Sequence, residues 1–346
     1  MNILAKIISR IYLGFLFNKS PEKSHDVALN QLDKLHKLRL LNFLGINKKY
    51  FSPVSCMGID FPNMLGLAAG LDKNGDYIDA LSSLGFGYIE IGTVTPKPQL
   101  GNQKPRLFRL KKDKAIINRM GFNNKGVDYL IKQVEKSSYK GILGINIGKN
   151  ADTPIESAVD DYLICLRKVY DYSSYVTINI SSPNTKNLRD LQSEESLNNL
   201  LSCLIKERII LQKKYNKYVP LVVKISPDIN KTQINTLAKV FLKNKIDAVI
   251  ATNTSVSRPS DLKHTEISSE IGGLSGAPIK DISTDVIKIL SKQLKSKIPI
   301  IGCGGISCGS DAKEKILAGA TLLQVYTSFI YKGPNVISDI LKNIEN

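Results

Sequence analysis

The chain has 346 residues, of which 42% are hydrophobic and 23% charged, so it can bury a large core and does not belong to the disordered class. Its net charge of +17 comes from scattered lysines without a long basic run, which argues against a nucleic-acid-binding protein. Lysine-rich composition and attraction to anionic lipid both stay open as explanations of the charge. Five cysteines without C-x-x-C spacing and only three histidines disfavour a disulfide framework and a metal centre.

The segment from Met1 to about Ile46 predicts two apolar helices ahead of the main body. In the first helix one stripe carries the apolar residues Leu4, Ile7, Ile8, Ile11, Tyr12 and Phe15. Ser20-Pro21-Glu22 is a helix-start signal, and the second helix carries leucines at positions 29, 32, 35, 38 and 41. The pattern fits a membrane-surface device and helices packed on the body equally well. The sequence contains no run of 18 apolar residues, so it predicts no membrane span. No signal peptide is expected either.

Eight short apolar runs, rich in Ile, Val and Gly, follow Pro53. They are Leu65–Ala69, Tyr88–Val94, Ile142–Ile147, Tyr175–Ser181, Leu221–Ile225, Ala248–Thr252, Pro299–Gly302 and Leu322–Tyr326. Helical patterns lie between most of them, for example Thr153–Val169, Glu194–Lys214, Lys231–Leu242 and Ile279–Leu294. Eight strands alternating with helices predict an α/β chain whose parallel sheet closes into a (β/α)8 TIM barrel. We expect a helical extension over residues 1–46 and a barrel over residues 47–346.

Polar residues follow all eight predicted strands, at the ends where barrels of this kind carry their active sites. Asp72 is the only acid among these residues, and no histidine occurs there. Hydrolysis by two carboxylates and metal-assisted chemistry are therefore disfavoured. Amides, hydroxyls, glycines and lysines dominate, and such groups suit planar heterocycles and phosphate.

Three features indicate the ligands. The clusters Gly272–Gly276, Gly304–Gly305 and Tyr326–Thr327 together favour a phosphate site near the last two strands, although each glycine alone fits a turn. Lys224 stands inside an apolar strand, where an unpaired charge is costly, so we expect it to face an anion such as a reduced flavin. Four amides can converge on a pyrimidine with alternating N–H and C=O groups: Asn118, Asn179, Asn184 and Asn253.

Five segments together resemble the dihydroorotate dehydrogenases, and within them the quinone-linked class 2 branch. They are Gly66–Lys73, Ile91–Pro96, Lys104–Arg109, Asn118–Asn124 and Asn179–Thr185. The resemblance covers nearly the whole chain. It implies FMN bound by Ala69, Gly70, Leu71, Asp72, Lys73, Thr93, Asn146, Asn179, Lys224, Thr252, Gly276, Gly305, Tyr326 and Thr327. It implies dihydroorotate held by Lys73, Asn118, Arg119, Met120, Gly121, Phe122, Asn179, Asn184, Asn253 and Thr254.

The resemblance also implies a mechanism and a place in the cell. Ser182 becomes the catalytic base, which takes a proton from C5 of dihydroorotate while a hydride leaves C6 for the flavin, and Thr185 with a water is a candidate for activating it. Class 1 enzymes carry a cysteine in this role, so the serine and the N-terminal extension both point to class 2. The final acceptor is then a quinone, which enters between N-terminal helices that contact the membrane, and His25 is expected to be structural. We expect a monomer of pyrimidine biosynthesis, peripheral on the cytoplasmic face of the cell membrane, without metal.

Two other readings compete with this one. An FMN barrel oxidoreductase that uses NAD(P)H or another pyrimidine is the nearer rival, but the sequence carries neither a nicotinamide-binding domain nor an iron–sulfur cysteine cluster. A basic nucleic-acid-binding protein on a barrel scaffold is the second, and it predicts a colourless protein whose affinity for DNA falls with salt.

Overall fold

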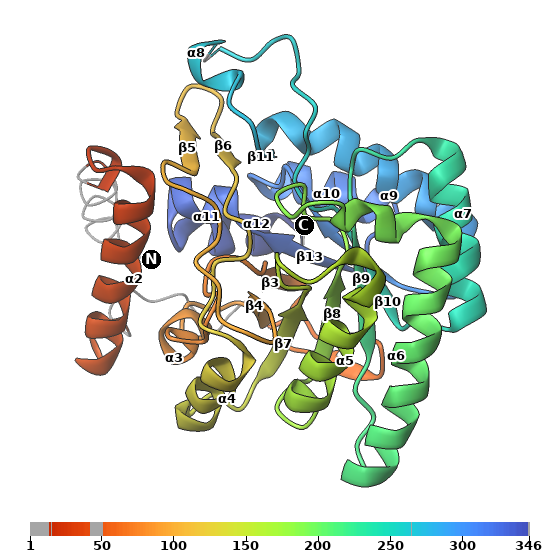
Figure 1. The fold of residues 1–346 in the computed structure, drawn as a ribbon. Helices are drawn as coiled ribbons and strands as arrows, with labels where there is room; N and C mark the ends of the chain where they lie inside the picture. Colours follow the sequence, from red (N-terminus) through yellow and green to blue (C-terminus); the bar gives the residue numbers. More distant parts are fainter. Residues whose placement is uncertain (1–13, 15, 42–50, 264, 345–346) are drawn as a thin grey trace.

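Eight parallel strands close into a barrel in the order β10-β12-β13-β3-β4-β7-β8-β9. The computed structural model describes residues 14, 16–41, 51–263 and 265–344 (Figure 1). The barrel strands are β3 (Leu65–Leu67), β4 (Tyr88–Val94), β7 (Ile142–Ile147), β8 (Tyr175–Asn179), β9 (Leu221–Ile225), β10 (Ala248–Ala251), β12 (Ile300–Cys303) and β13 (Leu322–Val325). Each coincides with a predicted run to within two residues at either end, so the predicted (β/α)8 barrel is confirmed.

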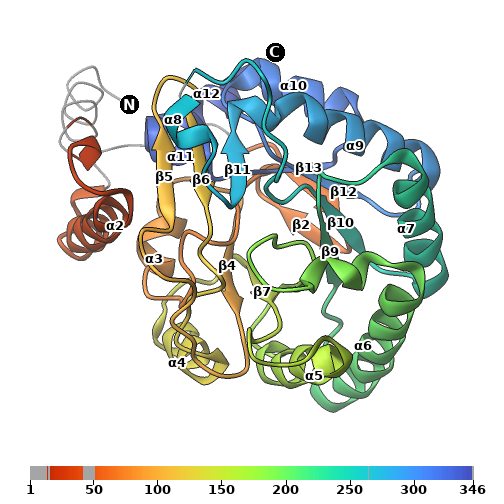
Figure 2. The same ribbon diagram turned by 45° about the horizontal axis from the view of Figure 1, so that its top comes forward.

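Helices surround the barrel, as the view along it shows (Figure 2). The longer ones are α4 (Val127–Lys136), α5 (Ala158–Val169), α6 (Glu194–Tyr215), α7 (Lys231–Asn244), α9 (Lys280–Leu294), α10 (Gly309–Leu317) and α12 (Asn335–Ile344). Short ones are α3 (Ile78–Ser82), α8 (Thr265–Ser268), α11 (Thr327–Lys332) and the 3-10 turns η2 (Ile155–Ser157), η3 (Leu188–Gln192) and η4 (Ala277–Ile279). The four predicted helical patterns are confirmed, and α7 begins at a capping box in which Asn230 and Gln233 cap each other.

Aromatic rings fill the N-terminal end of the barrel. Tyr88 and Tyr175 meet edge to face at 6.3 Å, and Phe61 from the hairpin β1 (Val54–Cys56) and β2 (Ile59–Phe61) packs on Tyr88 at 5.0 Å. A Cβ at Gly66 would lie 2.3 Å from the Tyr88 ring, and one at Gly144 2.2 Å from the Tyr175 ring. The glycines therefore make room for the two tyrosines inside the barrel. A ligand has to bind at the opposite, C-terminal end.

A three-stranded antiparallel sheet stands at that C-terminal end and was not predicted. Its order is β11-β6-β5, with β5 (Leu107–Leu110), β6 (Ala115–Asn118) and β11 (Gly273–Gly276). Most of the cluster Gly272–Gly276, which was predicted only as part of a phosphate site, is a strand, because Gly273 to Gly276 pair with Asn118 to Ala115. Pairing between segments more than 150 residues apart leaves no periodic trace in either one.

The described part of the N-terminal extension contains α2 (Pro21–Lys37), which packs against α3 and β5 (Figure 1). Pro21 and Glu22 stand in its first turn as predicted, and Glu22 forms an ion pair with Arg106 at 2.7 Å. Leu29 is buried against the barrel, whereas Leu38 follows the helix and is 68% exposed. The first predicted helix falls almost entirely outside the described residues, as does the boundary at residue 46. No helix of the described ranges is long and apolar enough to cross a membrane.

Candidate active site

A cavity of about 1010 Å³, partly open to solvent, lies at the C-terminal ends of the barrel strands and is called the main cavity here. Most of the predicted site residues line it together: Ala69, Gly70, Lys73, Thr93, Asn118, Met120, Gly121, Phe122, Asn179, Ser182, Asn184, Lys224, Thr252, Asn253, Thr254, Gly276, Gly305, Tyr326 and Thr327. Residues in or directly after every barrel strand except β7 thus meet at one place, although they are spread along the chain from Ala69 to Thr327.

Four predicted residues do not line the main cavity. The Asp72 carboxylate accepts hydrogen bonds from the backbone N–H groups of Gly75 and Tyr77, both at 2.8 Å, and shapes the loop after β3. Leu71 faces another cavity, and Arg119 forms an ion pair with Glu270 at 2.5 Å. Asn146 lies one layer deeper, where its Oδ1 accepts a hydrogen bond from Thr93 Oγ1 at 2.6 Å.

A hydrogen-bonded chain supports the main cavity from inside the barrel. It starts at Glu90, whose carboxylate accepts hydrogen bonds from Asn146, Tyr175, Thr177 and Gln324. Asn146 holds Thr93, Thr93 accepts a hydrogen bond from Asn179, and Asn179 accepts one from Asn253. The amides of Asn179 and Asn253, which line the cavity, are therefore fixed in orientation before any ligand binds.

Sequence reasoning missed Glu90 and Gln324. Glu90 is 1% exposed within the predicted strand Tyr88–Val94, and Gln324 is fully buried within Leu322–Tyr326. The signal that could have found them is a polar residue inside an apolar run. The same kind of signal identified Lys224. Further lining residues outside the predicted site residues and clusters are Ile279, Cys303, Ile306 and Val325.

Lys224 is 6% exposed and lines the main cavity from β9, where it pairs in register with Asn179 of β8. It forms no ion pair with any residue that the structure describes. A buried ammonium group without a carboxylate partner is costly, so the cavity favours an anionic ligand beside Lys224.

Near the last two strands, two glycines line the main cavity at positions where a side chain would clash. Gly276 and Gly305 have φ of +100° and +74°. A Cβ would lie 2.4 Å from the Lys114 carbonyl oxygen at Gly276 and 2.2 Å from the Lys280 Cα at Gly305. Only glycine fits both positions, so backbone groups are presented there without side chains, as anion sites require.

Ser182 follows β8 and is 6% exposed at the main cavity. Its Oγ accepts a hydrogen bond from the Asn184 N–H at 3.3 Å, and Asn184 Nδ2 donates to Asn118 Oδ1 at 3.1 Å. Thr185 stands three residues further along the chain. Its Oγ1 is buried and has no hydrogen-bond partner among the described residues. The loop after β8 thus carries the Ser182 hydroxyl, the Asn184 amide and the unsatisfied Thr185 hydroxyl, and Asn118 of β6 contacts it.

Lys73 and His25 carry shifted pKa values on the side of the cavity that faces α2. Burial, and then the nearby Arg106 charge, lowers the pKa of Lys73 to about 8. Burial, followed by the Lys73 charge, lowers the pKa of His25 to about 3, so this histidine is neutral at pH 7. Lys73 is then largely an ammonium group at pH 7 and can bind a carboxylate.

A second cavity of about 1000 Å³ lies between α2, β5, β6 and α11. Its walls are mostly apolar: Leu16, Phe17, Ala28, Leu29, Leu32, Leu71, Leu107, Ile116, Phe329 and Ile330. His25 and Arg109 supply polar groups, and Tyr326 lines both cavities. The two cavities therefore meet at one side chain. In the described part of the chain, no cluster of His, Cys, Asp or Glu is arranged to hold a metal ion.

Comparisons with known proteins agree with this geometry. The family model for dihydroorotate dehydrogenase matches residues 52–346. A protein from Idiomarina loihiensis named dihydroorotate dehydrogenase (quinone) is 57% identical over 329 residues, covering 95% of this chain and 98% of that protein. A protein of the same name from Psychrobacter arcticus is 53% identical over 330 residues, covering 95% of each chain.

Solved structures agree as well. DHODH from Eimeria tenella in complex with ferulenol has a TM-score of 0.86 at 38% identity, covering 94% of this chain and 90% of that chain. The ligand-free form from the same organism gives a TM-score of 0.85 at 37% identity, covering 94% of each chain. The resemblance seen in the five sequence segments is thereby confirmed, and the chain belongs to the quinone-linked branch of the dihydroorotate dehydrogenase family.

Proposed function

We propose that this enzyme oxidises (S)-dihydroorotate to orotate in pyrimidine biosynthesis, with FMN as the hydride acceptor and a membrane quinone as the final electron acceptor. The observation that carries the proposal is the pair of cavities that meet at Tyr326. One has amides, hydroxyls and two lysines among its lining residues and suits a flavin with a pyrimidine substrate. The other is apolar and suits a quinone. The two half-reactions would then take place in separate cavities that lie next to each other.

Enzymes of this family are flavoproteins, and the residues of the main cavity fit FMN. Lys224 offers an unpaired positive charge, and the glycine positions 276 and 305 offer backbone groups for a phosphate. Gln324 Oε1 and Ser328 Oγ are buried polar atoms without partners among the described residues, and both side chains line the cavity. A polar ligand with N–H and phosphate groups satisfies both. When bound, FMN takes up a hydride and passes its electrons on to a quinone.

The substrate half of the cavity suits dihydroorotate. Asn118, Asn179, Asn184 and Asn253 provide amide donors and acceptors for the pyrimidine ring, and Lys73 provides charge for its carboxylate. Ser182 Oγ is the proposed base, which removes the proton from C5 as the hydride leaves C6. A free serine is a weak base, so its proton has to move on, and the unsatisfied Thr185 hydroxyl is the proposed next carrier.

The second cavity is the proposed quinone site, and the extension over residues 1–46 is the proposed quinone and membrane module ahead of the barrel over 47–346. Leu38 and Leu40, 68% and 42% exposed, follow α2. They stand beside the basic Lys34, Lys37 and Arg39. Exposed apolar groups with basic neighbours favour an anionic membrane surface. We propose peripheral attachment at the cytoplasmic face, by a monomer.

The test is anaerobic mixing of the purified protein with dihydroorotate while the flavin absorbance is followed. We expect bleaching, and recovery after addition of a soluble quinone. A yellow protein that bleaches with NADH but not with dihydroorotate would replace the substrate assignment with the rival FMN oxidoreductase. A colourless protein that takes up no FMN would refute the proposal at its cofactor.

A further inference from the structure

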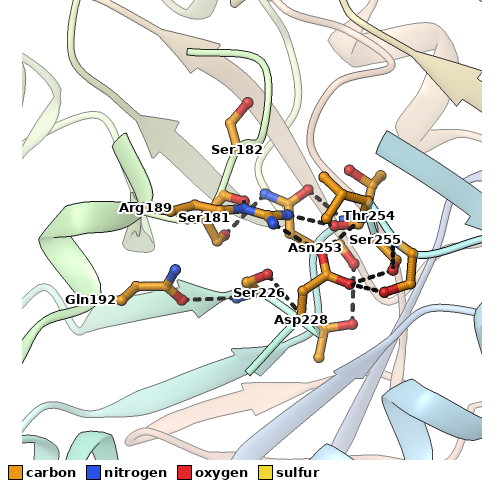
Figure 3. A network of polar contacts seen from close by, with 12 residues as sticks. Ser181, Ser182, Arg189, Gln192, Ser226, Asp228, Asn253, Thr254 and Ser255 are labelled. Carbon is orange, nitrogen blue, oxygen red and sulfur yellow. Dashed lines mark hydrogen bonds and ion pairs between the residues drawn. The ribbon is translucent and has the colours of Figure 1, made fainter. Parts of the chain in front are cut away.

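Arg189 connects three loops at the C-terminal end of the barrel (Figure 3). It lies in η3, and each of its three guanidinium nitrogens donates to a different loop. Nε donates to the Ser181 carbonyl oxygen at 3.2 Å, Nη1 to Asp228 Oδ2 at 2.9 Å, and Nη2 to the Thr254 carbonyl oxygen at 3.1 Å. The loops after β8, β9 and β10 are therefore held by one planar group.

Asp228 anchors this arrangement on the side of β9. Its carboxylate accepts hydrogen bonds from Ser255 Oγ, from the Val256 N–H at 2.8 Å and from Ser257 Oγ at 3.2 Å. Burial acts to raise the pKa of Asp228, but these hydrogen bonds and the Arg189 charge lower it overall. The carboxylate is thus ionised at pH 7 and ties the loop after β10 to the loop after β9.

The same loops carry reacting groups of the proposed site. Ser182 follows Ser181 directly, and Asn253 precedes Thr254. On the cavity side Asn253 Nδ2 donates to Ser181 Oγ at 3.0 Å, so the loops after β8 and β10 are cross-linked a second time. Neither Arg189 nor Asp228 lines the main cavity. Any effect of the pair on the chemistry has to pass through the loops.

We propose that Arg189, held by Asp228, is a positioning residue that sets the place of Ser182 Oγ against the substrate. The inference rests on the proposed function. The guanidinium fork has a fixed geometry that a flexible ammonium group cannot reproduce at three acceptors at once. A displacement of about 1 Å at a reacting group can cost about 100-fold in rate. Loss of the guanidinium group should therefore slow the abstraction of the proton and leave the flavoprotein otherwise intact.

Arg208 and Asp247 offer a matched control. They form another ion pair of similar burial, with side chains 8% and 14% exposed against 23% and 11% for Arg189 and Asp228. Asp247 immediately precedes β10 and accepts a hydrogen bond from the Leu221 N–H, so this pair lies at the N-terminal end of the barrel, away from the main cavity. Arg208→Met should reduce stability without touching the chemistry.

The experiment compares flavin-loaded, full-length Arg189→Met and Arg208→Met with the unaltered enzyme by stopped-flow absorbance. For Arg189→Met we expect the limiting rate of flavin reduction at saturating dihydroorotate to fall about 10- to 100-fold. The dihydroorotate concentration at half-saturation should change much less. Reoxidation of the photoreduced flavin by a soluble quinone should stay within about 2-fold, because the three loops lie on the substrate side. Arg208→Met should keep both rates.

Three results would overturn the inference. They are an unchanged reduction rate in Arg189→Met, equal losses in both half-reactions, or an equal loss in Arg208→Met. Asp228→Asn adds a second test, since it should slow reduction alone, and the double variant should be no slower than Arg189→Met. If Arg189→Met does not fold, Arg189→Lys, which keeps the charge but not the fork, is judged by the same criteria. If dihydroorotate does not reduce even the unaltered enzyme, the proposed function fails instead.

Discussion

Gln324 Nε2 donates a hydrogen bond to Glu90 Oε2 at 2.8 Å inside the barrel, and the other amide atom of Gln324, Oε1, has no partner among the described residues. Because Glu90 also accepts hydrogen bonds from Asn146, Tyr175 and Thr177, it cannot act as a donor to Gln324 without losing one of them. The carboxylate therefore fixes which end of the Gln324 amide is left for a ligand in the main cavity.

Glu90→Gln should destabilise the protein and loosen the flavin. The new amide places an NH2 group among four donors, which leaves buried donors unsatisfied at a cost of about 1–3 kcal/mol in the free energy of unfolding. Chemical denaturation measures this, with the exposed Glu195→Gln as the matched control, expected within about 0.5 kcal/mol of the unaltered protein. Flavin retention after dialysis reports on Gln324. Equal stability of the two variants would mean that the four hydrogen bonds to the Glu90 carboxylate do not stabilise the fold.

Ser182→Ala should remove most of the flavin reduction by dihydroorotate and leave flavin content unchanged. Loss of a general base typically costs about 100- to 10,000-fold. Ser182→Cys should retain more activity than the alanine variant, with a lower pH optimum, because a thiol loses its proton more readily than a hydroxyl. Rapid mixing with dihydroorotate checks both. If the alanine variant is reduced at the normal rate, the base has to be sought elsewhere in the loop.

Affinity for the product orotate should fall as the pH rises through about 8. Burial and the Arg106 charge lower the pKa of Lys73 to about 8, so the ammonium form that binds a carboxylate is present below this pH and is lost above it. Orotate titrations followed by flavin absorbance between pH 6 and 10 measure this step, the fall in affinity around pH 8. Lys73→Met should bind orotate weakly at every pH and show no step. A step that survives in this variant would belong to another group.

The sequence predicted the barrel well because each strand and helix leaves a local periodic signal. The runs from Tyr88 and from Leu221 coincide with β4 and β9 at both ends. The sheet of β5, β6 and β11 was missed because it depends on a pairing between Gly273 and Asn118. No local sequence pattern near either residue indicates this pairing. Distant antiparallel pairing is decided by tertiary packing rather than by local pattern.

Prediction of the site was limited in another way. Motif positions identified the residues that gather at the main cavity, but not which way each side chain points. Leu71 and Asp72 stand in one segment with Gly70 and Lys73, yet Leu71 faces the second cavity and Asp72 folds the loop. The opposite error concerns Glu90, whose role depends on four partners from three other strands. Side-chain direction in an irregular loop has no period from which it can be read.

Filling the second cavity should stop quinone reduction and spare the reaction with dihydroorotate. Ala28 lines this cavity from α2, and Ala28→Trp places a large side chain among its apolar walls. Gln31, three residues further along the same helix, is exposed, so Gln31→Trp is the matched control. We expect the rate of flavin reoxidation by a soluble quinone to fall at least about 10-fold for Ala28→Trp alone. The indole occupies space that the quinone needs, and one methylene more or less in an apolar pocket is already worth about 1–3 kcal/mol. Reduction by dihydroorotate should proceed normally in both variants. A quinone that reoxidises Ala28→Trp as fast as Gln31→Trp must reach the flavin by another route, and the second cavity would lose its proposed role.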